Sequence, residues 1–186
     1  ADLNGRMQED PESLTEQDRA ELLNLYDGEI RYMDHSLERL LSKLESRGAR
    51  ENTAIVVTAD HGEAFGEHGR YGHHPHNYAE LMHVPLVIDV PGSGGHEVNQ
   101  QVSLIDIPPT LCDLCGLKTP EAVQGKSLLP LMYGKGRGDD VVICTASGGD
   151  MLASRTPEWK CLWDRKDNNV ELYHLPNDPC EQHDVS

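Results

Sequence analysis

A long stretch with helical periodicity, followed at once by a β-branched run, is the feature that most constrains the fold. Apolar residues recur at steps of three or four from Leu22 to Leu44, the spacing of one face of an α-helix. Thr15 with Asp18 resembles a helix N-cap, and Gly48 is suited to end the helix. About 30 helical residues would extend roughly 45 Å at ~1.5 Å per residue, so their apolar stripe needs a sheet to cover.

The residues that follow predict such a sheet. The run at 53–59, TAIVVTA, is typical of a strand buried on both faces, and a second strand is expected at 85–90. The glycine- and histidine-rich segment between them is expected to be a loop with one helical turn around 77–82. A short strand at 101–104 and a helix at 106–114 come next. This alternation predicts an α/β fold with a mostly parallel sheet and covering helices.

The C-terminal part has a different pattern. The glycine-rich segment 134–138 is the best linker candidate, and short strand-like runs follow it without intervening helices. These runs are 141–145, 151–154, 159–163 and 170–175. We therefore expect an α/β core at 1–135, beginning with a loop at 1–14, and a small antiparallel subdomain at 136–186.

The composition limits the possible partners. The 186 residues include 32 acidic and 16 basic ones, which gives a net charge of −16. This charge argues against binding to nucleic acid or to an anionic membrane surface, and the absence of an 18-residue apolar run argues against a membrane-spanning segment. An acidic, lysine-poor surface suits high salt, although ordinary acidic proteins share it. The chain starts without Met or a signal peptide and is expected to be a processed product or fragment, which leaves localisation and oligomeric state open.

The pair Asp60-His61 directly after the first predicted strand is the sharpest chemical feature. Ligands of open α/β sheets bind beyond the carboxyl ends of strands. A carboxylate beside an imidazole at that place is a natural ligand pair for a divalent metal, and Gly62 lets the backbone turn away. The alternative is that Asp60 only caps the next element.

Histidines are concentrated after this pair. Six of the ten histidines lie between positions 61 and 83, and histidine suits proton transfer, metal ligation and anion binding near neutral pH. The alternative for each of them is a solvated loop side chain. The chain has no H-E-x-x-H, G-x-S-x-G, P-loop or G-x-G-x-x-G motif, so the enzyme classes that these motifs mark are unsupported.

Four blocks resemble the sulfatase family of the alkaline phosphatase superfamily. The first block is TAIVVTADHGEAFGEHGRYGHHPHNYAELMHVPLVIDVPG. Three further blocks occur in the same order as in the family. They are the long helix before the first block, a D-x-x-P-T…G-x-S-L-x-P-L segment and a C-terminal K-x-x…E-L-Y…D-P-x-E segment. The resemblance covers nearly the whole chain past position 15 but only the back half of a sulfatase. The family's paired aspartates and its C-x-P-S-R motif, whose cysteine or serine becomes formylglycine, do not occur here.

The resemblance implies roles for individual residues. Asp60 and His61 correspond to the family's second pair of metal ligands. The family implies calcium, whereas an imidazole ligand also suits manganese or zinc. No lysine lies between Lys43 and Lys118, and His73 stands closest to the place of the family's sulfate-contacting lysine. His74 follows it. Either histidine could bind an anionic ester oxygen or protonate a leaving group, and a third, weaker candidate is the basic side chain Arg70.

The expected function is hydrolysis of sulfuric esters with a divalent metal. The substrate would be a sulfate ester, either a small molecule or a glycan, and this chain would supply part of the site. Formylglycine is expected only in the missing N-terminal part, so the isolated chain is expected to be inactive. One alternative is a phosphodiesterase or phosphonate monoester hydrolase on the same scaffold, and another is a non-catalytic binding or structural module. The nucleophile in the upstream sequence would discriminate between them.

Overall fold

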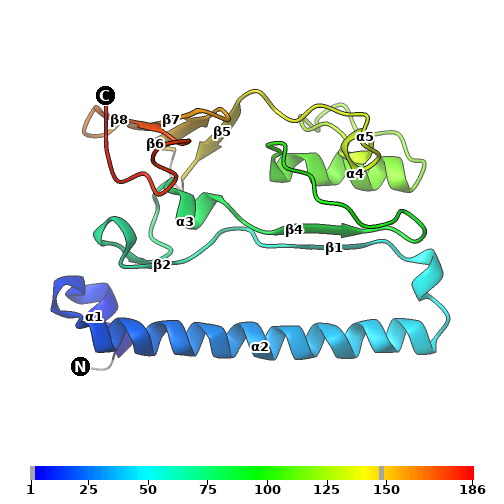
Figure 1. Cartoon of the computed structure of the whole chain (residues 1–186), viewed down its shortest axis with the longest axis horizontal. Coiled ribbons are helices and arrows are strands. Elements are labelled where there is room, and N and C mark those ends of the chain that lie inside the picture. Colours follow the sequence, from blue (N-terminus) through cyan, green and yellow to red (C-terminus); the bar gives the residue numbers. More distant parts are fainter. Residues whose placement is uncertain (1–2, 147–148) are drawn as a thin grey trace. The chain divides into compact units, whose positions relative to one another are not determined.

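The chain, drawn in Figure 1, folds into two compact units. The computed structural model describes residues 3–146 and 149–186, and contacts divide the chain into units at 1–95 and 96–186. The prediction of a boundary after residue 135 stays a prediction, and that position lies inside the second unit. Residues 1 and 2 of the expected N-terminal loop lie outside the described residues.

The long helix α2 spans Glu16–Ser46, as the periodicity predicts. The Thr15 hydroxyl accepts the backbone N–H of Asp18 at 3.2 Å, and the Asp18 carboxylate accepts the Thr15 N–H at 2.8 Å. This reciprocal capping box confirms the predicted N-terminus. The chain leaves the helix at Gly48, whose φ of +64° is the left-handed conformation common just after a helix.

The apolar stripe of α2 is covered only at its ends. Leu22 is buried and Leu37, Leu41 and Leu44 are half-buried, whereas every side chain at 23–36 is exposed. The strands of the same unit are too short to cover the whole helix, because four residues extend about 13 Å and 31 residues of helix about 46 Å. The expectation that the full stripe packs on a sheet is therefore met only in part by the described chain.

The expected loop before α2 contains a helix. Helix α1 spans Leu3–Glu9, and a 3-10 turn follows at Pro11–Ser13. The Arg6 guanidinium donates a hydrogen bond to the Asp18 carboxylate at 3.0 Å and forms an ion pair with it. The hydrogen bonds from Arg6, and then those from Thr15, hold the pKa of Asp18 well below its usual range. The prediction of a loop was wrong because this contact with Asp18, in the first turn of α2, is not visible in local periodicity.

Strand β1, Ile55–Thr58, pairs with β4, Leu86–Asp89, as an antiparallel ribbon. All strand pairs among the described residues are antiparallel, so the expected parallel orientation is corrected here. An apolar run predicts a buried strand but not its direction, and a parallel connection usually needs a long crossover helix. The only α-helix in the connection between these strands, at 59–85, is the short α3, Ala79–Met82. With one partner, β1 is also half-buried rather than buried on both faces.

A short hairpin interrupts the loop after β1. Strands β2, Ala64–Phe65, and β3, Tyr71–Gly72, are joined by a 3-10 turn at Glu67–Gly69. The Arg19 guanidinium of α2 donates to the Glu67 carboxylate at 3.0 Å, and the rings of Tyr26 and Phe65 meet edge to face with centroids 5.0 Å apart. The hairpin is thereby fastened to the first half of α2.

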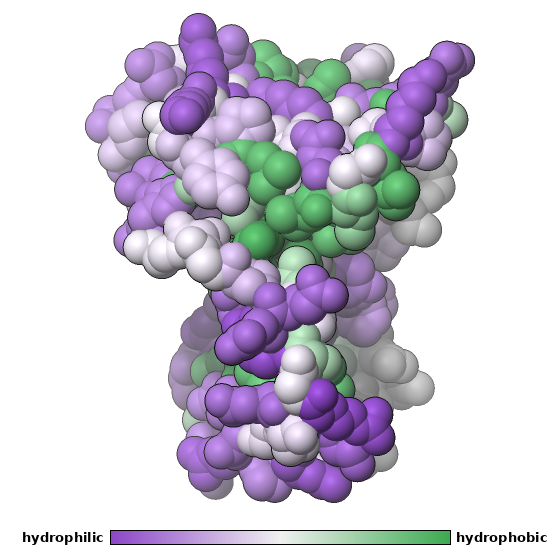
Figure 2. Space-filling model, turned by 90° about the vertical axis from the view of Figure 1, so that its right-hand side faces the viewer, coloured by the Kyte–Doolittle hydropathy of each residue, from purple (hydrophilic) through white to green (hydrophobic). Residues whose placement is uncertain are grey.

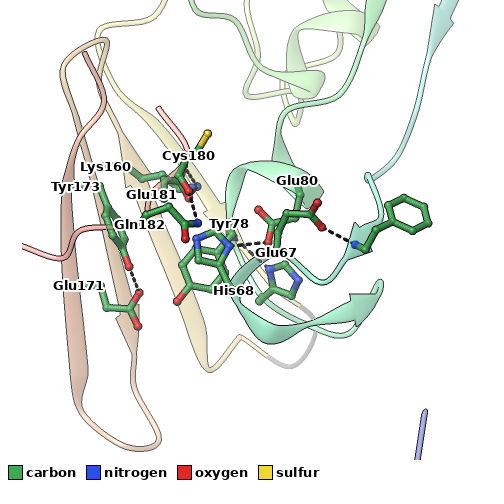
Figure 3. A network of polar contacts seen from close by, with 12 residues as sticks. Glu67, His68, Tyr78, Glu80, Lys160, Glu171, Tyr173, Cys180, Glu181 and Gln182 are labelled. Atoms are coloured by element: carbon green, nitrogen blue, oxygen red, sulfur yellow. Dashed lines mark hydrogen bonds and ion pairs between the residues drawn. The ribbon is translucent and has the colours of Figure 1, made fainter. Parts of the chain in front are cut away.

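The segment before α3 forms a small buried core. His76, Asn77, Tyr78 and Leu81 are each at most 8% exposed. The His68 ring stacks on the Tyr78 ring with centroids 3.8 Å apart, and its Nδ1 lies 2.9 Å from the Glu80 carboxylate (Figure 3). This core holds the loop that begins at the end of β1.

The second unit begins with a buried polar motif. The 3-10 turn η4, Leu104–Asp106, leads into α4, Ile107–Leu114, as predicted for the helix. The buried Asp106 carboxylate accepts the backbone N–H groups of Ser103 and Lys126 at 3.0 and 2.9 Å. The expected strand at 101–104 was wrong, because the contact with Asp106 closes a turn there. The D-x-x-P-T residues therefore tie the turn before α4 to the chain that leads to α5, Leu129–Met132.

The remaining strands form the predicted antiparallel sheet, in the order β5-β6-β7-β8. They are β5, Val142–Thr145, β6, Met151–Arg155, β7, Trp159–Asp164, and β8, Asn169–His174. One face of the sheet carries the buried residues Ala153, Lys160, Leu162 and Tyr173. The opposite face is partly apolar and exposed.

A buried ion pair closes this unit. Lys160 and Glu181 are each 2% exposed, and the Lys160 ammonium lies 2.8 Å from both carboxylate oxygens (Figure 3). A charge removed from water is stable only when it is paired in this way. Lys160 belongs to the K-x-x segment and Glu181 to the D-P-x-E segment of the sequence. The buried ion pair gives both segments a structural role.

Hydrophilic residues cover much of the face shown in Figure 2, and apolar residues are exposed between them in several places. No helix in 3–146 or 149–186 combines the length and apolarity needed to cross a bilayer.

Replacing Glu181 by Ala should lower the free energy of unfolding by about 3–5 kcal/mol, because the buried Lys160 ammonium would lose the carboxylate that lies 2.8 Å from it. Both tryptophans of the chain lie in β7, so urea unfolding followed by their fluorescence reports on this sheet. As a control, Asp140→Ala breaks an exposed pair with Arg137 and should change stability by less than about 0.5 kcal/mol. Equal effects of the two substitutions would contradict this account.

The Glu67 contact should make the first unit sensitive to acid. Burial opposes ionisation of Glu67, but the Phe65 N–H and the Arg19 guanidinium outweigh it and lower its pKa. A carboxyl whose pKa is lowered by folding stabilises the fold above its unfolded pKa of about 4.3, and this stabilisation is lost as pH falls through the lower folded value. Thermal melts followed by helical circular dichroism should show that Glu67→Gln lowers the stability of the fold more at about pH 6 than at about pH 3. An equal loss of stability at both pH values would contradict a stabilising role for the ionised Glu67 carboxylate.

Candidate functional site

Asp60 and His61 extend from the end of β1, as the sequence predicts. The Asp60 carboxylate accepts the backbone N–H of His61 at 3.1 Å, and its side chain is 91% exposed. The second carboxylate oxygen lies 3.8 Å from Nε2 of His61. Two atoms that both lie about 2.0–2.4 Å from one cation can be this far apart, so the pair fits a shared metal ion.

The orientation of His61 also suits a metal ligand. Its Nδ1 lies 2.8 Å from the Gly62 carbonyl oxygen, which can only accept a hydrogen bond. We therefore assign the ring proton to Nδ1, which leaves the lone pair of Nε2 on the side of Asp60. Histidines that bind metals usually donate their other ring N–H to a carbonyl or carboxylate in this way.

The donor set of this pair is incomplete for a closed site. In the two described ranges, no group of three or more His, Cys, Asp or Glu side chains is arranged to hold a metal ion. The pair offers one carboxylate and one imidazole. These donors fit manganese or zinc, while calcium prefers oxygen ligands alone.

Gly62 anchors this segment, because its backbone N–H donates to the Leu81 carbonyl at 2.9 Å. A Cβ at this position would lie 1.9 Å from the Glu80 carbonyl oxygen. Only glycine permits this approach, so the turn that carries Asp60 and His61 is fixed against α3.

His73 lies next to His61. The two rings are stacked, with centroids 4.8 Å apart and an interplanar angle of 28°. Nδ1 of His73 is 3.1 Å from the carboxylate of Glu63, and the histidine side chain is 64% exposed. The structure thus brings together His61, a candidate metal ligand, and His73, the histidine that the sequence analysis singled out as a candidate contact for the ester.

A cavity of about 150 Å³ lies beside these rings. It is lined by Met7, Glu63, Gly72, His73, His74 and Pro75. Its wall combines two imidazoles and a carboxylate with the apolar Met7 of α1. His74 therefore shares the cavity with His73, whereas Arg70 is exposed just before β3 and is not among the lining residues.

The other histidines of the cluster have different surroundings. His68 is paired with Glu80 and stacked on Tyr78, and His76 is 1% exposed in the core before α3. His83 is exposed after α3. For these three, a structural or solvated role explains the observations.

Sequence reasoning missed Glu63 and Met7 as members of the site. Glu63 follows Asp60-His61-Gly62 directly, but only the hairpin register brings it to His73. Met7 falls in the segment that was expected to be a loop and reaches the cavity because α1 is helical.

Comparison with known proteins identifies the family to which this chain is similar. The sulfatase family model matches residues 4–117. The choline-sulfatase of Rhizobium meliloti is 30% identical over 175 residues, which cover 90% of this chain and 34% of that protein.

Two solved structures add detail. A phosphonate monoester hydrolase from Silicibacter pomeroyi superposes with a TM-score of 0.80 at 26% identity, over 96% of this chain and 40% of that one. A protein solved in complex with its substrate D-glucosamine-2-N,6-O-disulfate gives a TM-score of 0.70 at 27% identity, over 84% and 34%.

The chain spans only 13% to 35% of the length of three curated relatives that it matches. The structural neighbours have the sulfatase fold, which confirms the predicted α/β, alkaline-phosphatase-like class. Because the family model matches more than half of the chain, the predicted relationship is also confirmed. The chain belongs to the sulfatase family, within the alkaline phosphatase superfamily.

Proposed function

We propose that this chain supplies the metal-binding and imidazole part of a site that hydrolyses sulfuric esters. The observation that carries the proposal is the contact between His61, oriented as a metal ligand, and His73 at the edge of the cavity. Family membership and the names of the relatives support the same reaction class.

Asp60 and His61 would hold a divalent cation. When bound, this cation supplies positive charge that stabilises the oxygens of the group being transferred. The resemblance favours calcium, and the imidazole nitrogen makes manganese or zinc an equal candidate on chemical grounds. The Gly62 carbonyl keeps Nε2 of His61 available for this role.

His73 and His74 would contact the ester. The chain carries a net charge of −16, which repels an anionic substrate, so positive charge must be concentrated at the site. An imidazolium can bind an ester oxygen, and the same ring can donate a proton to the departing alcohol. Arg70 is a weaker candidate because it does not line the cavity.

The substrate we propose is a sulfate ester of a small molecule or a glycan. The solved relative in complex with a sulfated glucosamine supports this class. The sequence has no C-x-P-S-R motif, so the formylglycine nucleophile is not supplied by these residues and the chain alone should not turn over.

A phosphodiester or phosphonate ester is the second candidate substrate. Three observations favour it. They are the Asp-His pair, the absence of lysine between Lys43 and Lys118, and the phosphonate monoester hydrolase among the structural neighbours. A non-catalytic binding module is the remaining alternative.

The isolated chain should bind divalent metal weakly, because two protein ligands leave most of the coordination shell to water. Isothermal titration calorimetry should show Mn²⁺ or Zn²⁺ binding that is lost in Asp60→Asn and in His61→Ala. His83→Ala removes an exposed histidine outside the site and should leave it intact. Submicromolar calcium binding by the wild-type chain would contradict the two-ligand site.

The chain alone should not hydrolyse a chromogenic aryl sulfate with added calcium or manganese, but it should bind one. In NMR spectra, a non-hydrolysed aryl sulfate should shift the ring signals of His73 and His74 and leave those of His83 in place. His73→Ala should weaken this binding several-fold. Clear turnover would overturn the proposal that this chain holds only part of the site, and tighter binding of an aryl phosphonate would favour the second candidate substrate.

A further inference from the structure

Glu63 and His73 face each other across the base of the β2–β3 hairpin. Ala64 pairs with Gly72, so the next residue outward on each strand is Glu63 on one side and His73 on the other. Directly opposed residues of an antiparallel pair have neighbouring side chains, and register fixes which residues are opposed. The backbone of the hairpin therefore brings this carboxylate and this imidazole together.

The surroundings favour a fixed contact. The Glu63 side chain is only 22% exposed, and its Oε2 lies 3.1 Å from Nδ1 of His73. Gly72 has a φ of +76°, and a Cβ there would lie 3.4 Å from the other carboxylate oxygen. A glycine thus adopts the left-handed turn and leaves room for the carboxylate.

The His73 ring is held on two sides. The His61 ring stacks on its face, and Glu63 contacts its edge at Nδ1. A carboxylate only accepts hydrogen bonds, so the contact favours the ring form that carries its proton on Nδ1. Nε2 of His73 has no hydrogen-bond partner among the described side chains and remains available to a ligand.

We propose that Glu63 is a positioning residue that fixes the orientation and the Nδ1–H tautomer of His73, so that Nε2 is presented to the ester. The proposal rests on the proposed function for what Nε2 contacts. It adds a residue to which the sequence analysis gave no role. It also explains how an imidazole is oriented where the chain has no lysine.

The proposal is tested by determining the tautomer of His73 in the 186-residue chain. Long-range ¹H–¹⁵N NMR spectra at about pH 9 observe neutral rings, since the ordinary histidine pKa is about 6.5. The wild-type chain should show His73 protonated at Nδ1. Glu63→Ala should replace this pattern by a mixture of tautomers, and Glu63→Gln should retain it, because the amide oxygen still accepts the Nδ1–H.

His61 is the internal control, because its Nδ1–H is held by the Gly62 carbonyl and should keep its pattern in both variants. The helical circular dichroism of α2 checks that each variant is folded. An unchanged His73 pattern in folded Glu63→Ala, or a wild-type ring protonated at Nε2, would overturn the proposal.

A functional readout separates this proposal from the proposed function. Glu63→Ala should weaken aryl sulfate binding several-fold while metal binding by Asp60 and His61 stays unchanged. If the wild-type chain binds neither metal nor ester, the proposed function fails, and the tautomer result still decides the role of Glu63. If the wild type binds the ester and Glu63→Ala binds it equally well, the positioning role fails alone.

Discussion

The close packing of Gly62 against α3 is the constraint on which the candidate site depends. The backbone passes so near the Glu80 carbonyl that no side chain fits at this position. Asp60 and His61 therefore directly precede the fixed residue Gly62, and Glu63 directly follows it and leads into the hairpin. The hairpin in turn brings His73 back to His61, so the geometry of the site follows from one short backbone contact.

Polar groups of the family motifs are buried in the second unit but exposed at the candidate site of the first unit. In the second unit, Asp106 satisfies backbone N–H groups, and the pair formed by Lys160 and Glu181 is removed from water. Both are satisfied internally, which is typical of groups that hold a fold together. In the first unit, the carboxylate of Asp60 and the ring of His73 are exposed and can meet a ligand. Burial thus separates the structural motifs of the family resemblance from the residues that we propose as ligands.

Much of the fold could be predicted from local patterns. The N-cap at Thr15, the helical period of α2 and the four C-terminal strands depend on neighbours in sequence, and the structure confirms them. The direction of β4 relative to β1 and the helix at Leu3–Glu9 could not be predicted in the same way. Strand direction depends on the path of the connecting chain, and α1 is tied by the pairing of Arg6 with Asp18.

The sequence by itself determined the family and the identity of the chemical groups at the candidate site. The run Asp60-His61-Gly62 after a strand and the histidines that follow are local features, and motif order carries the resemblance to sulfatases. Only the tertiary structure decided which histidines belong together. His73 reaches His61 and Glu63 through hairpin register, while His68 and His76 are held in the core before α3. Register and burial depend on contacts between distant residues, which spacing along the chain does not encode.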